Sequence, residues 1–308
     1  MCSYLSTSTL TNVFDTGKFT TTLQSVESGT SAPPKPLLVA APVEAGTFPL
    51  LLFLHGFMLY NSFYSQLISH VASHGFIVIA PQLYLFAGAD TSDEIHSAAA
   101  VINWLAEGLS GFLQSNVKPD YNKLAVAGHS RGGKVAFALA LRKLNVTTNL
   151  KFMALIGVDP VDGMDRGKQT PPPILTCVPH SFDFDMPAMV IGSGLGDVKR
   201  NPLFPPCAPK GVNHENFFNE CPKPSWYFVA KDYGHSDMLD DDTKGFRGKS
   251  TYCVCKNGES RKPMRRFVGG AIVAFLKAYL QGHYGDLMAV RDRQETVPLE
   301  LKTVEFYV

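Results

Sequence analysis

One junction constrains this chain more than any other feature. A short apolar run at residues 124–127 meets the sequence GHSRG at 128–132, and a second apolar run follows. The first run is partly β-branched and predicts a buried strand, whereas the small and apolar residues from Lys134 onward predict a buried helix. A strand that turns at once into a helix strains the backbone of its central residue, Ser130, and needs glycine where the two elements nearly touch. Tight packing alone would also use glycines, but the strand before and the helix after favour a nucleophile elbow.

The rest of the chain alternates between strand-like and helix-like segments. We expect helices within residues 62–76, 90–113 and 265–282, and strands within 35–46, 48–57, 76–84, 151–160 and 186–197 and at the start of 225–239. This alternation implies βαβ units and a mostly parallel central sheet with helices on both faces. We expect residues 21–308 to form a single α/β domain with long loops after the later strands, at 160–187 and 198–224. Residues 1–20 are expected to be a flexible or strand-forming N-terminal segment.

Composition excludes several classes of function. Lys and Arg number 28 and Asp and Glu 27, and the resulting formal charge of +1 offers no basic field to attract nucleic acid. No apolar run approaches the roughly 20 residues of a transmembrane helix. The first 20 residues lack the charged start and apolar core of a secretory signal, and with no Arg they make a poor plastid transit peptide. We therefore expect a protein that neither binds nucleic acid nor spans a membrane.

The six cysteines do not form a metal-binding pattern. One residue separates Cys253 from Cys255, instead of the two usual in zinc sites, and no histidine follows at finger spacing, so we expect no metal site. Cys207 and Cys221 flank a loop rich in Pro and Asn. They could form a disulfide, although the sequence does not separate that arrangement from free thiols.

A serine hydroxyl becomes a nucleophile only when a base takes its proton, and the base is usually a histidine oriented by a carboxylate. Four histidines follow Ser130 in the chain. Among them, His235 lies in a polar loop that comes directly after an apolar strand and before the last helix. A loop in that place delivers its side chain to the edge of the sheet, so we expect His235 to be the base.

The orienting carboxylate has two main candidates, with Asp162 and Asp232 as weaker ones. Asp159 ends the apolar run one strand after the elbow, and Asp197 ends the run two strands after it. Strand order leans towards Asp197, but either strand end can bring an acid to the histidine, and an aspartate in such a place is also a common loop cap. The residues alone leave the choice open.

The negative charge that develops on an ester substrate needs two N–H donors. One is expected from the backbone of Arg131, directly after the nucleophile, and the other from the loop after residues 48–57, at Phe57 or Met58. A bulky apolar substrate would also need an apolar pocket. The candidates at its edge are Met58, Tyr60 and Phe63, with further loop residues Met164, Phe182, Phe184, Leu203, Phe204, Phe217 and Phe218 that could instead pack for stability.

Three segments resemble plant chlorophyllases: GHSRGGK around Ser130, GVDPVDG around Asp159 and YGHSDMLDD around His235. The resemblance runs from about residue 20 to the last helix, while HGF and GHSxGG are shared more widely with cutinase-like and plasma-lipase-like esterases. It implies an α/β-hydrolase fold and a triad of Ser130, Asp159 and His235. The cutinase-like relatives instead favour Asp197 as the acid.

The resemblance also implies a specific function. Such an enzyme hydrolyses the phytyl ester of chlorophyll to chlorophyllide and phytol through an acyl-enzyme intermediate, without a cofactor, since the magnesium belongs to the substrate. Its partner is this small-molecule substrate, reached by peripheral contact with membranes. Its compartment is the chloroplast, with the cytosol or another compartment as the alternative because of the N-terminus. The rival functions are a general carboxylesterase or lipase acting on other apolar esters, and a non-catalytic binding protein, which would normally have lost Ser130 or His235.

Overall fold

A computed structural model describes residues 12–30, 32–292 and 297–308 of the chain. The buried apolar runs form strands of one central sheet, because alternate side chains of each strand enter the core on opposite faces. Within the described residues the strands are β1 (Thr21–Val26), β2 (Leu37–Pro42), β3 (Gly46–Leu54), β4 (Ile77–Pro81), β5 (Val117–His129), β6 (Phe152–Val158), β7 (Ala188–Ser193), β8 (Ser225–Ala230) and β9 (Leu301–Tyr307).

The order of the strands across the sheet is β1-β2-β4-β3-β5-β6-β7-β8-β9. Neighbours from β4 to β8 are parallel, whereas β1, β2 and β9 add antiparallel pairs at the two edges. The predicted mostly parallel sheet is confirmed, and the chain has an α/β-hydrolase fold. The carboxyl ends of the parallel strands meet at one edge of such a sheet, where their loops can form a common site.

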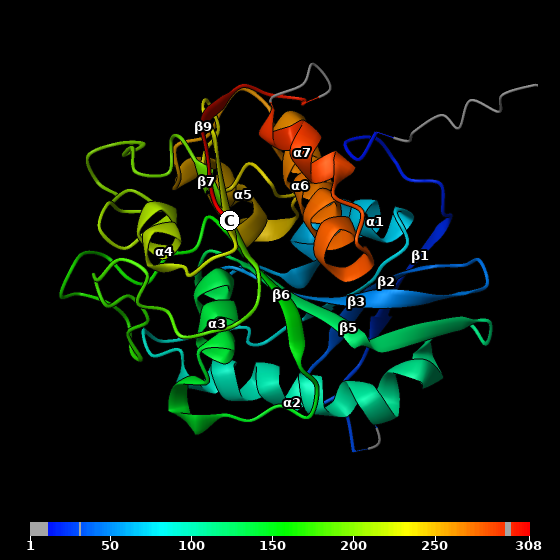
Figure 1. Ribbon diagram of the computed structural model, residues 1–308. Coiled ribbons are helices and arrows are strands. Elements are labelled where there is room, and N and C mark those ends of the chain that lie inside the picture. Colours follow the sequence, from blue (N-terminus) through cyan, green and yellow to red (C-terminus); the bar gives the residue numbers. More distant parts are fainter. Residues whose placement is uncertain (1–11, 31, 293–296) are drawn as a thin grey trace, which may run out of the picture.

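Helices cover both faces of the sheet (Figure 1). On one face lie α1 (Ser65–Ser73) and α6 (Arg261–Gln281), and on the other α2 (Ser92–Gly108) and α3 (Arg131–Ala140). Shorter helices follow the later strands: α4 (His214–Glu220), α5 (Gly245–Cys253) and α7 (Gly285–Arg291), besides the 3₁₀ turns η1 (Asn61–Tyr64), η2 (Leu109–Phe112) and η3 (Lys143–Asn145). No helix in the part of the chain that the structure describes is long and apolar enough to cross a bilayer.

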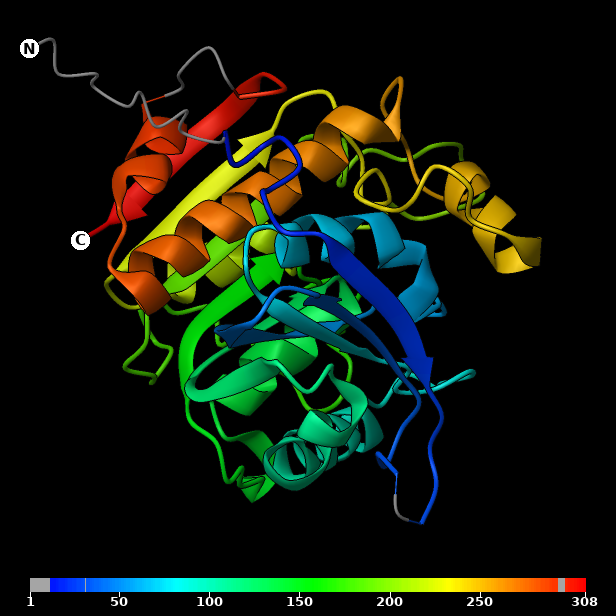
Figure 2. The same cartoon turned by 90° about the vertical axis from the view of Figure 1, so that its right-hand side faces the viewer.

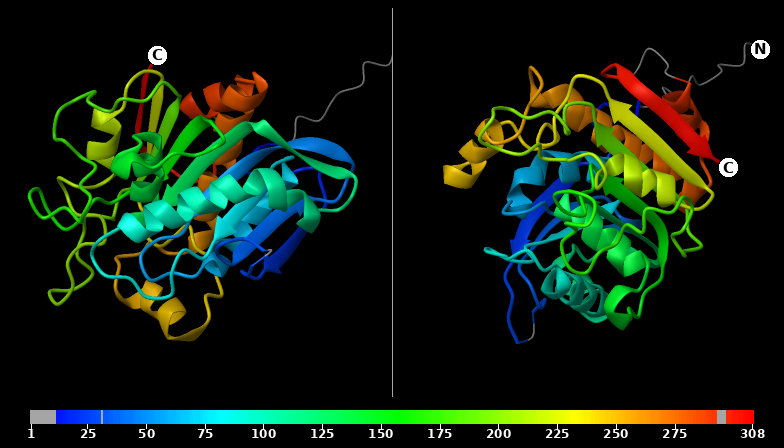
Figure 3. Two further views of the ribbon diagram at one scale, coloured as in Figure 1. Left: turned by 90° about the horizontal axis from the view of Figure 1, so that it is seen from below. Right: turned by 90° about the vertical axis from the view of Figure 1, so that its left-hand side faces the viewer.

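The long loops after the later strands differ from each other in what they contribute. Residues 160–187 contain no helix, and residues 198–224 contain only α4. Phe182 and Phe217 of these loops are buried against the ring of Phe137, and Phe218 is buried against Tyr227 and Tyr307, so all three rings stabilise the fold. Leu203, by contrast, is 87% exposed. Helix α5 stands out from the body of the molecule (Figures 2 and 3).

The structure describes residues 12–20 of the expected N-terminal segment. Residues 1–11 lie outside the described residues, but Val13 and Phe14 are buried, and the Phe14 ring stacks on Phe267 of α6 with 6.2 Å between ring centroids. Gly270 of α6 allows this approach, because a Cβ there would collide with the Phe14 ring. Residues 12–20 thus pack against the domain that we expected to begin at residue 21.

Candidate active site

The turn predicted from strand to helix at Ser130 is present. Ser130 joins β5 to α3 with φ 56° and ψ −121°, a region that residues other than glycine rarely occupy. A Cβ on Gly128 would collide with the carbonyl of Gly132, and a Cβ on Gly132 would collide with the carbonyl of Leu54. Both flanking glycines are therefore required by the close approach of β3, β5 and α3.

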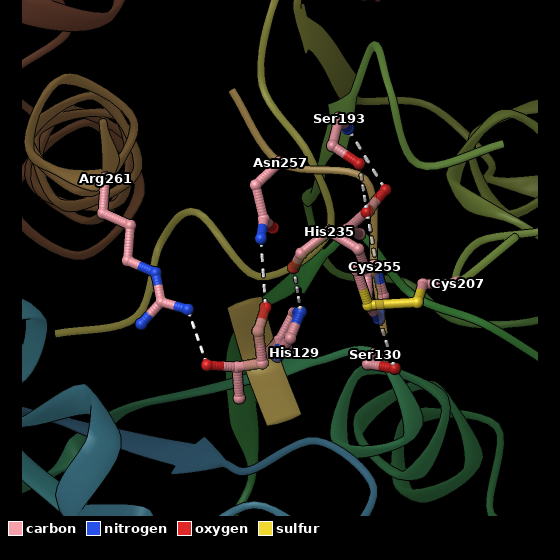
Figure 4. The surroundings of a disulfide bond; sticks show 10 residues. His129, Ser130, Ser193, Cys207, His235, Cys255, Asn257 and Arg261 are labelled. Carbon is pink, nitrogen blue, oxygen red and sulfur yellow. Dashed lines mark hydrogen bonds and ion pairs between the residues drawn. A yellow bond between two sulfur atoms is a disulfide. The ribbon is translucent and has the colours of Figure 1, made fainter. Parts of the chain in front are cut away.

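Three of the predicted site residues lie within hydrogen-bond distance in a line. His235 Nε2 is 2.8 Å from Ser130 Oγ, and His235 Nδ1 is 2.7 Å from Asp159 Oδ2. Asp159 follows β6, and His235 lies in the loop after β8. Figure 4 shows this line of hydrogen bonds running from Ser130 past His235 towards Ser193. The arrangement allows a proton on the serine to pass to the imidazole while the carboxylate orients the ring.

Asp159 is held as an anion. Its carboxyl group has no exposed surface, and it also accepts hydrogen bonds from the hydroxyl of Ser193 and, at 3.1 Å, from the Ser193 N–H. Burial by itself raises the pKa of Asp159, but the hydrogen bond and charge of His235 outweigh it and bring that pKa to about 2. The negative charge therefore persists at neutral pH, where it can stabilise a protonated His235.

The alternative acid, Asp197, lies elsewhere on the sheet edge. Its carboxylate is 3.3 Å from Lys210 Nζ, and about a quarter of its side chain is exposed. The side chain that approaches Asp159 from this region is His214, whose Nε2 is 3.7 Å from Asp159 Oδ1 and whose Nδ1 is 2.8 Å from the hydroxyl of Tyr227. Sequence reasoning passed over His214 because it comes in a Pro- and Asn-rich loop.

The residues expected to form the oxyanion hole flank the nucleophile. A Cβ on Gly56 would lie 3.3 Å from Ser130 Cβ, so the loop after β3 runs directly beside the serine. Within the described residues, the backbone N–H groups of Phe57 and Arg131 have no hydrogen-bond acceptor. Two donors are therefore available next to Ser130.

The predicted pocket-edge residues have different environments. Met58 has φ 58° and is half-buried, as is Tyr60, whereas Phe63 is buried in the core beneath Tyr60. The ring of Phe57 is half exposed, and the Arg131 guanidinium lies over it, 5.3 Å from the ring centroid. Phe63 thus supports the loop from below, while Phe57, Met58 and Tyr60 lie nearer its surface.

The side chain of Arg131 has a structural contact that the sequence did not predict. Its guanidinium pairs with Glu94 of α2 at 2.5 Å and donates to the carbonyls of Gly88, Ala89 and Asp90. Because the pair is buried, Arg131 ties the elbow to the loop that precedes α2.

A buried ion pair joins two of the sequence motifs. Lys134 of the GHSRGGK segment lies 2.9 Å from Asp162 of the GVDPVDG segment, and both side chains are fully buried. Asp162 also accepts the N–H groups of Ile174 and Leu175, each at 2.9 Å. Asp162, a weak candidate for the acid, instead holds the loop after β6 against α3. In the sequence, only the presence of Lys134 in one motif and of Asp162 in the other pointed to this ion pair.

The disulfide prediction was wrong. Cys207 is bonded to Cys255, while Cys221, directly after α4, is a buried thiol that donates to the carbonyl of Phe217 at 3.2 Å. The physical reason is that α4 packs Cys221 into the core, while residues 255–258 cross the loop after β8 that carries His235 (the base loop). Asp237 Oδ2 accepts the N–H groups of Gly234 and Gly258, each at 2.7 Å, so this crossing segment and the disulfide lie beside His235 (Figure 4).

The family model and the similar proteins that match this chain all point to the same family. A family model described as Chlorophyllase matches residues 9–308. The chain is 58% identical to chlorophyllase-2 of Arabidopsis thaliana over 98% of this chain and 99% of that protein. It is 45% identical to chlorophyllase-1 of the same plant, with 94% and 90% covered, and 45% identical to a chloroplastic chlorophyllase-1 of Citrus unshiu, with 98% and 90% covered.

Proposed function

This chain belongs to the chlorophyllase family, and we propose that it is a serine esterase that hydrolyses the phytyl ester of chlorophyll, releasing chlorophyllide and phytol. One observation carries the mechanism: the unbroken hydrogen-bonded line from Asp159 through His235 to Ser130, beside two N–H groups that have no acceptor among the described residues. The choice of substrate is inferred from the family.

Acylation begins when His235 Nε2 takes the proton of Ser130 and the serine oxygen attacks the ester carbonyl. The N–H groups of Phe57 and Arg131 donate to the oxyanion of the tetrahedral intermediate. When the intermediate collapses, the bond to the phytyl oxygen breaks, and His235 returns its proton to that oxygen, so phytol leaves. Chlorophyllide remains joined to Ser130 as an ester.

Deacylation repeats these steps with water as the nucleophile. His235 takes a proton from water, the hydroxide attacks the acyl carbon, and the proton then returns to Ser130 as chlorophyllide departs. Asp159 keeps its charge throughout and stabilises the imidazolium of each step. All groups used belong to the chain, the substrate or water, so hydrolysis should persist in EDTA.

The decisive experiment compares the wild type with Ser130→Ala. With chlorophyll a as substrate, phytol and pigment are partitioned between hexane and aqueous acetone, and we expect chlorophyllide from the wild type alone. A serine-directed phosphonate should label Ser130 and no other residue. Labelling elsewhere, or hydrolysis by a folded Ser130→Ala protein, would contradict the proposed nucleophile.

The alternative of a general carboxylesterase makes a different prediction about substrate preference. Such an enzyme would turn over short p-nitrophenyl esters far faster than chlorophyll. We expect the reverse order of kcat/KM, because family members at 42–58% identity over most of the chain are named for chlorophyll. A strong preference for the short esters would favour the alternative.

We also propose that the protein contacts membranes peripherally to reach its apolar substrate. Phe86 is 79% exposed, Phe246 of α5 is 88% exposed, and the guanidinium of Arg247 lies 4.7 Å from the Phe86 ring centroid. Apolar side chains beside a cation suit an anionic lipid surface. Phe86→Ser combined with Phe246→Ser should reduce flotation with phosphatidylglycerol vesicles, and Leu144→Ser, which changes another exposed residue, should not. Equal flotation of all variants would contradict this proposal.

Two citrus relatives are named chloroplastic, and we propose the chloroplast as the compartment of this chain, with the cytosol as the alternative. Fluorescence of the full chain fused at its C-terminus to a reporter, together with protease protection in isolated chloroplasts, distinguishes the two compartments.

A further inference from the structure

A buried line of hydrogen bonds connects the two sides of the candidate site behind Ser130. The N–H of Gly56 lies 3.0 Å from the hydroxyl oxygen of Tyr64, and that oxygen lies 2.7 Å from His129 Nδ1. On the other side of the ring, His129 Nε2 lies 2.8 Å from the carbonyl oxygen of His235. Tyr64 and His129 have no exposed surface, so water does not compete for these bonds.

The direction of each proton follows from chemistry. A backbone N–H can only donate, so Gly56 donates to the Tyr64 oxygen, and the tyrosine proton is free to go to His129 Nδ1. His129 then carries its proton on Nε2 and donates it to the carbonyl of His235, which can only accept. Burial, and next the charge of His235, lower the pKa of His129 to about 3, which agrees with a neutral ring. Both ring nitrogens are engaged, so His129 does not act as a second base.

The Gly56 N–H belongs to the His55–Gly56 peptide, and the next peptide, between Gly56 and Phe57, is held through its carbonyl. The carbonyl of Gly56 lies 2.9 Å from His55 Nδ1 and accepts the N–H of Leu59 at 3.2 Å. Because a peptide unit is planar, fixing this carbonyl also fixes the direction of the Phe57 N–H in the same unit. That N–H is one of the two expected oxyanion donors.

We propose that Tyr64 and His129 are positioning residues for ester hydrolysis. They hold the His55–Gly56 peptide, which directly precedes the peptide of the Phe57 N–H, together with the elbow and the backbone of His235, so that the oxyanion donor and the base meet Ser130 together. Neither side chain touches the reacting atoms. The inference rests on the proposed serine-esterase function, and it assigns a role to the histidine of the GHSRGGK segment.

Tyr64→Phe tests the line with the smallest change, since only the hydroxyl is lost. A displacement of reacting groups by about 1 Å can cost roughly 10²-fold in rate, so we expect kcat on a soluble p-nitrophenyl ester to fall 10- to 10²-fold. The KM should stay unchanged, because substrate contacts are intact. Tyr279→Phe is the matched control. The hydroxyl of Tyr279, on α6, accepts a hydrogen bond from Trp226 Nε1 at 2.8 Å, and loss of this hydroxyl should leave kcat unchanged.

A double-mutant cycle separates positioning from general loosening of the core. In His129→Gln the side-chain amide can still donate to the His235 carbonyl but no longer accepts from Tyr64, so adding Tyr64→Phe should cost little more. Wild-type kcat in Tyr64→Phe, or two losses that multiply independently, would overturn the inference. If Tyr64→Phe does not fold, His129→Gln and His129→Asn carry the test, because each can keep only one of the two ring contacts and should lose kcat at constant KM; wild-type kcat in either overturns it.

Phosphonate labelling distinguishes a failure of this inference from a failure of the serine-esterase function on which it rests. The wild type is first labelled at Ser130 with the phosphonate, and failure of that labelling refutes the esterase mechanism itself. Where the wild type is labelled, slower labelling of Tyr64→Phe supports the positioning role. An unchanged labelling rate together with unchanged kcat refutes only the positioning role.

Discussion

Asp159 directly follows β6 and Asp197 lies four residues after the end of β7, and the environment of each carboxylate decides which can orient His235. Asp159 is buried with its charge directed at His235 and Ser193, whereas Asp197 is partly exposed and faces Lys210. A carboxylate that is far from the imidazole cannot select its tautomer. The conformations agree with this distinction, because Asp159 has φ 45°, a strained value that its several partners maintain.

We predict that Asp159→Asn loses roughly 10⁴-fold in kcat, as expected when the shape of an orienting acid is kept and its charge is removed. Asp197→Asn should stay within a few-fold of the wild type. Steady-state kinetics on chlorophyll a measures both, and thermal unfolding checks that each variant folds. An inactive but folded Asp197→Asn protein beside an active Asp159→Asn protein would reverse the assignment while leaving Ser130 and His235 in place.

At the scale of elements, the site depends on how α3 is fastened to the loops around it. Lys134 and Asp162 are far from any solvent, and their ion pair joins the first turns of α3 to the loop that begins at Asp159. Arg131 and Glu94 make a second buried pair, between α3 and α2. Replacing both charges of such a buried pair by apolar residues changes the stability of the protein little. Removing one partner is strongly destabilising, because the other charge stays buried without its counter-ion.

Lys134→Met should therefore lower the free energy of unfolding by about 3–5 kcal/mol, because the buried side chain of Asp162 would lose its cationic partner. Urea unfolding measures the change. The double variant Lys134→Met with Asp162→Leu is the matched control, and it should recover part of the loss. If the single variant unfolds like the wild type, the pair does not fasten α3 to the loop.

The disulfide between Cys207 and Cys255 fastens two other loops. One follows β7, and the other is the segment 255–258 that crosses the loop carrying His235. It spans a sequence separation of 48 residues. Loops of this length give a stabilisation of roughly 4 kcal/mol in the chain-entropy account, so Cys207→Ser with Cys255→Ser should melt at a lower temperature. Cys177→Ser, which removes an exposed free cysteine, is the control. Dithiothreitol should lower the melting temperature of the wild type but not of the double variant; equal sensitivity in both would contradict this account.

At the scale of the whole molecule, the buried histidines tie stability to pH. Burial lowers the pKa of His55 to about 4 and that of His129 to about 3, against about 6.5 in an unfolded chain. Between these values the unfolded state binds more protons than the folded state. Stability must therefore decrease as the pH falls from about 6.5 towards 4.

Each such histidine should contribute a slope of about 1.4 kcal/mol per pH unit to the free energy of unfolding in that range. His74 also has a pKa lowered to about 4, chiefly by burial, and it directly follows α1 with its Nε2 2.9 Å from the carbonyl oxygen of Asp15. Urea unfolding of His74→Gln at several pH values should show a slope reduced by about one histidine, with esterase activity unchanged. An unaltered slope would show that His74 titrates normally in the folded protein.

The local parts of the site could be predicted from the sequence because their geometry is set by neighbours along the chain. The strained turn at Ser130 follows from a strand, two glycines and a helix within a dozen residues, and the parallel sheet follows from alternating apolar segments. The same local reasoning placed His235 in a loop after a strand. It also placed Asp159 correctly at the end of β6, whereas Asp197 lies four residues beyond β7, and the family resemblance, not the residues, ranked Asp159 first.

What the sequence by itself determined is therefore the type of each element and the identity of the reacting groups that lie next to one. Only the tertiary structure decided which distant groups meet: Cys207 with Cys255, Lys134 with Asp162, and Tyr64 with His129. These contacts join segments between 28 and 65 residues apart, and their partners depend on strand order and helix packing. The physical reason is that local propensity acts over a few residues, whereas buried polar groups take the partner that the packed core brings to them.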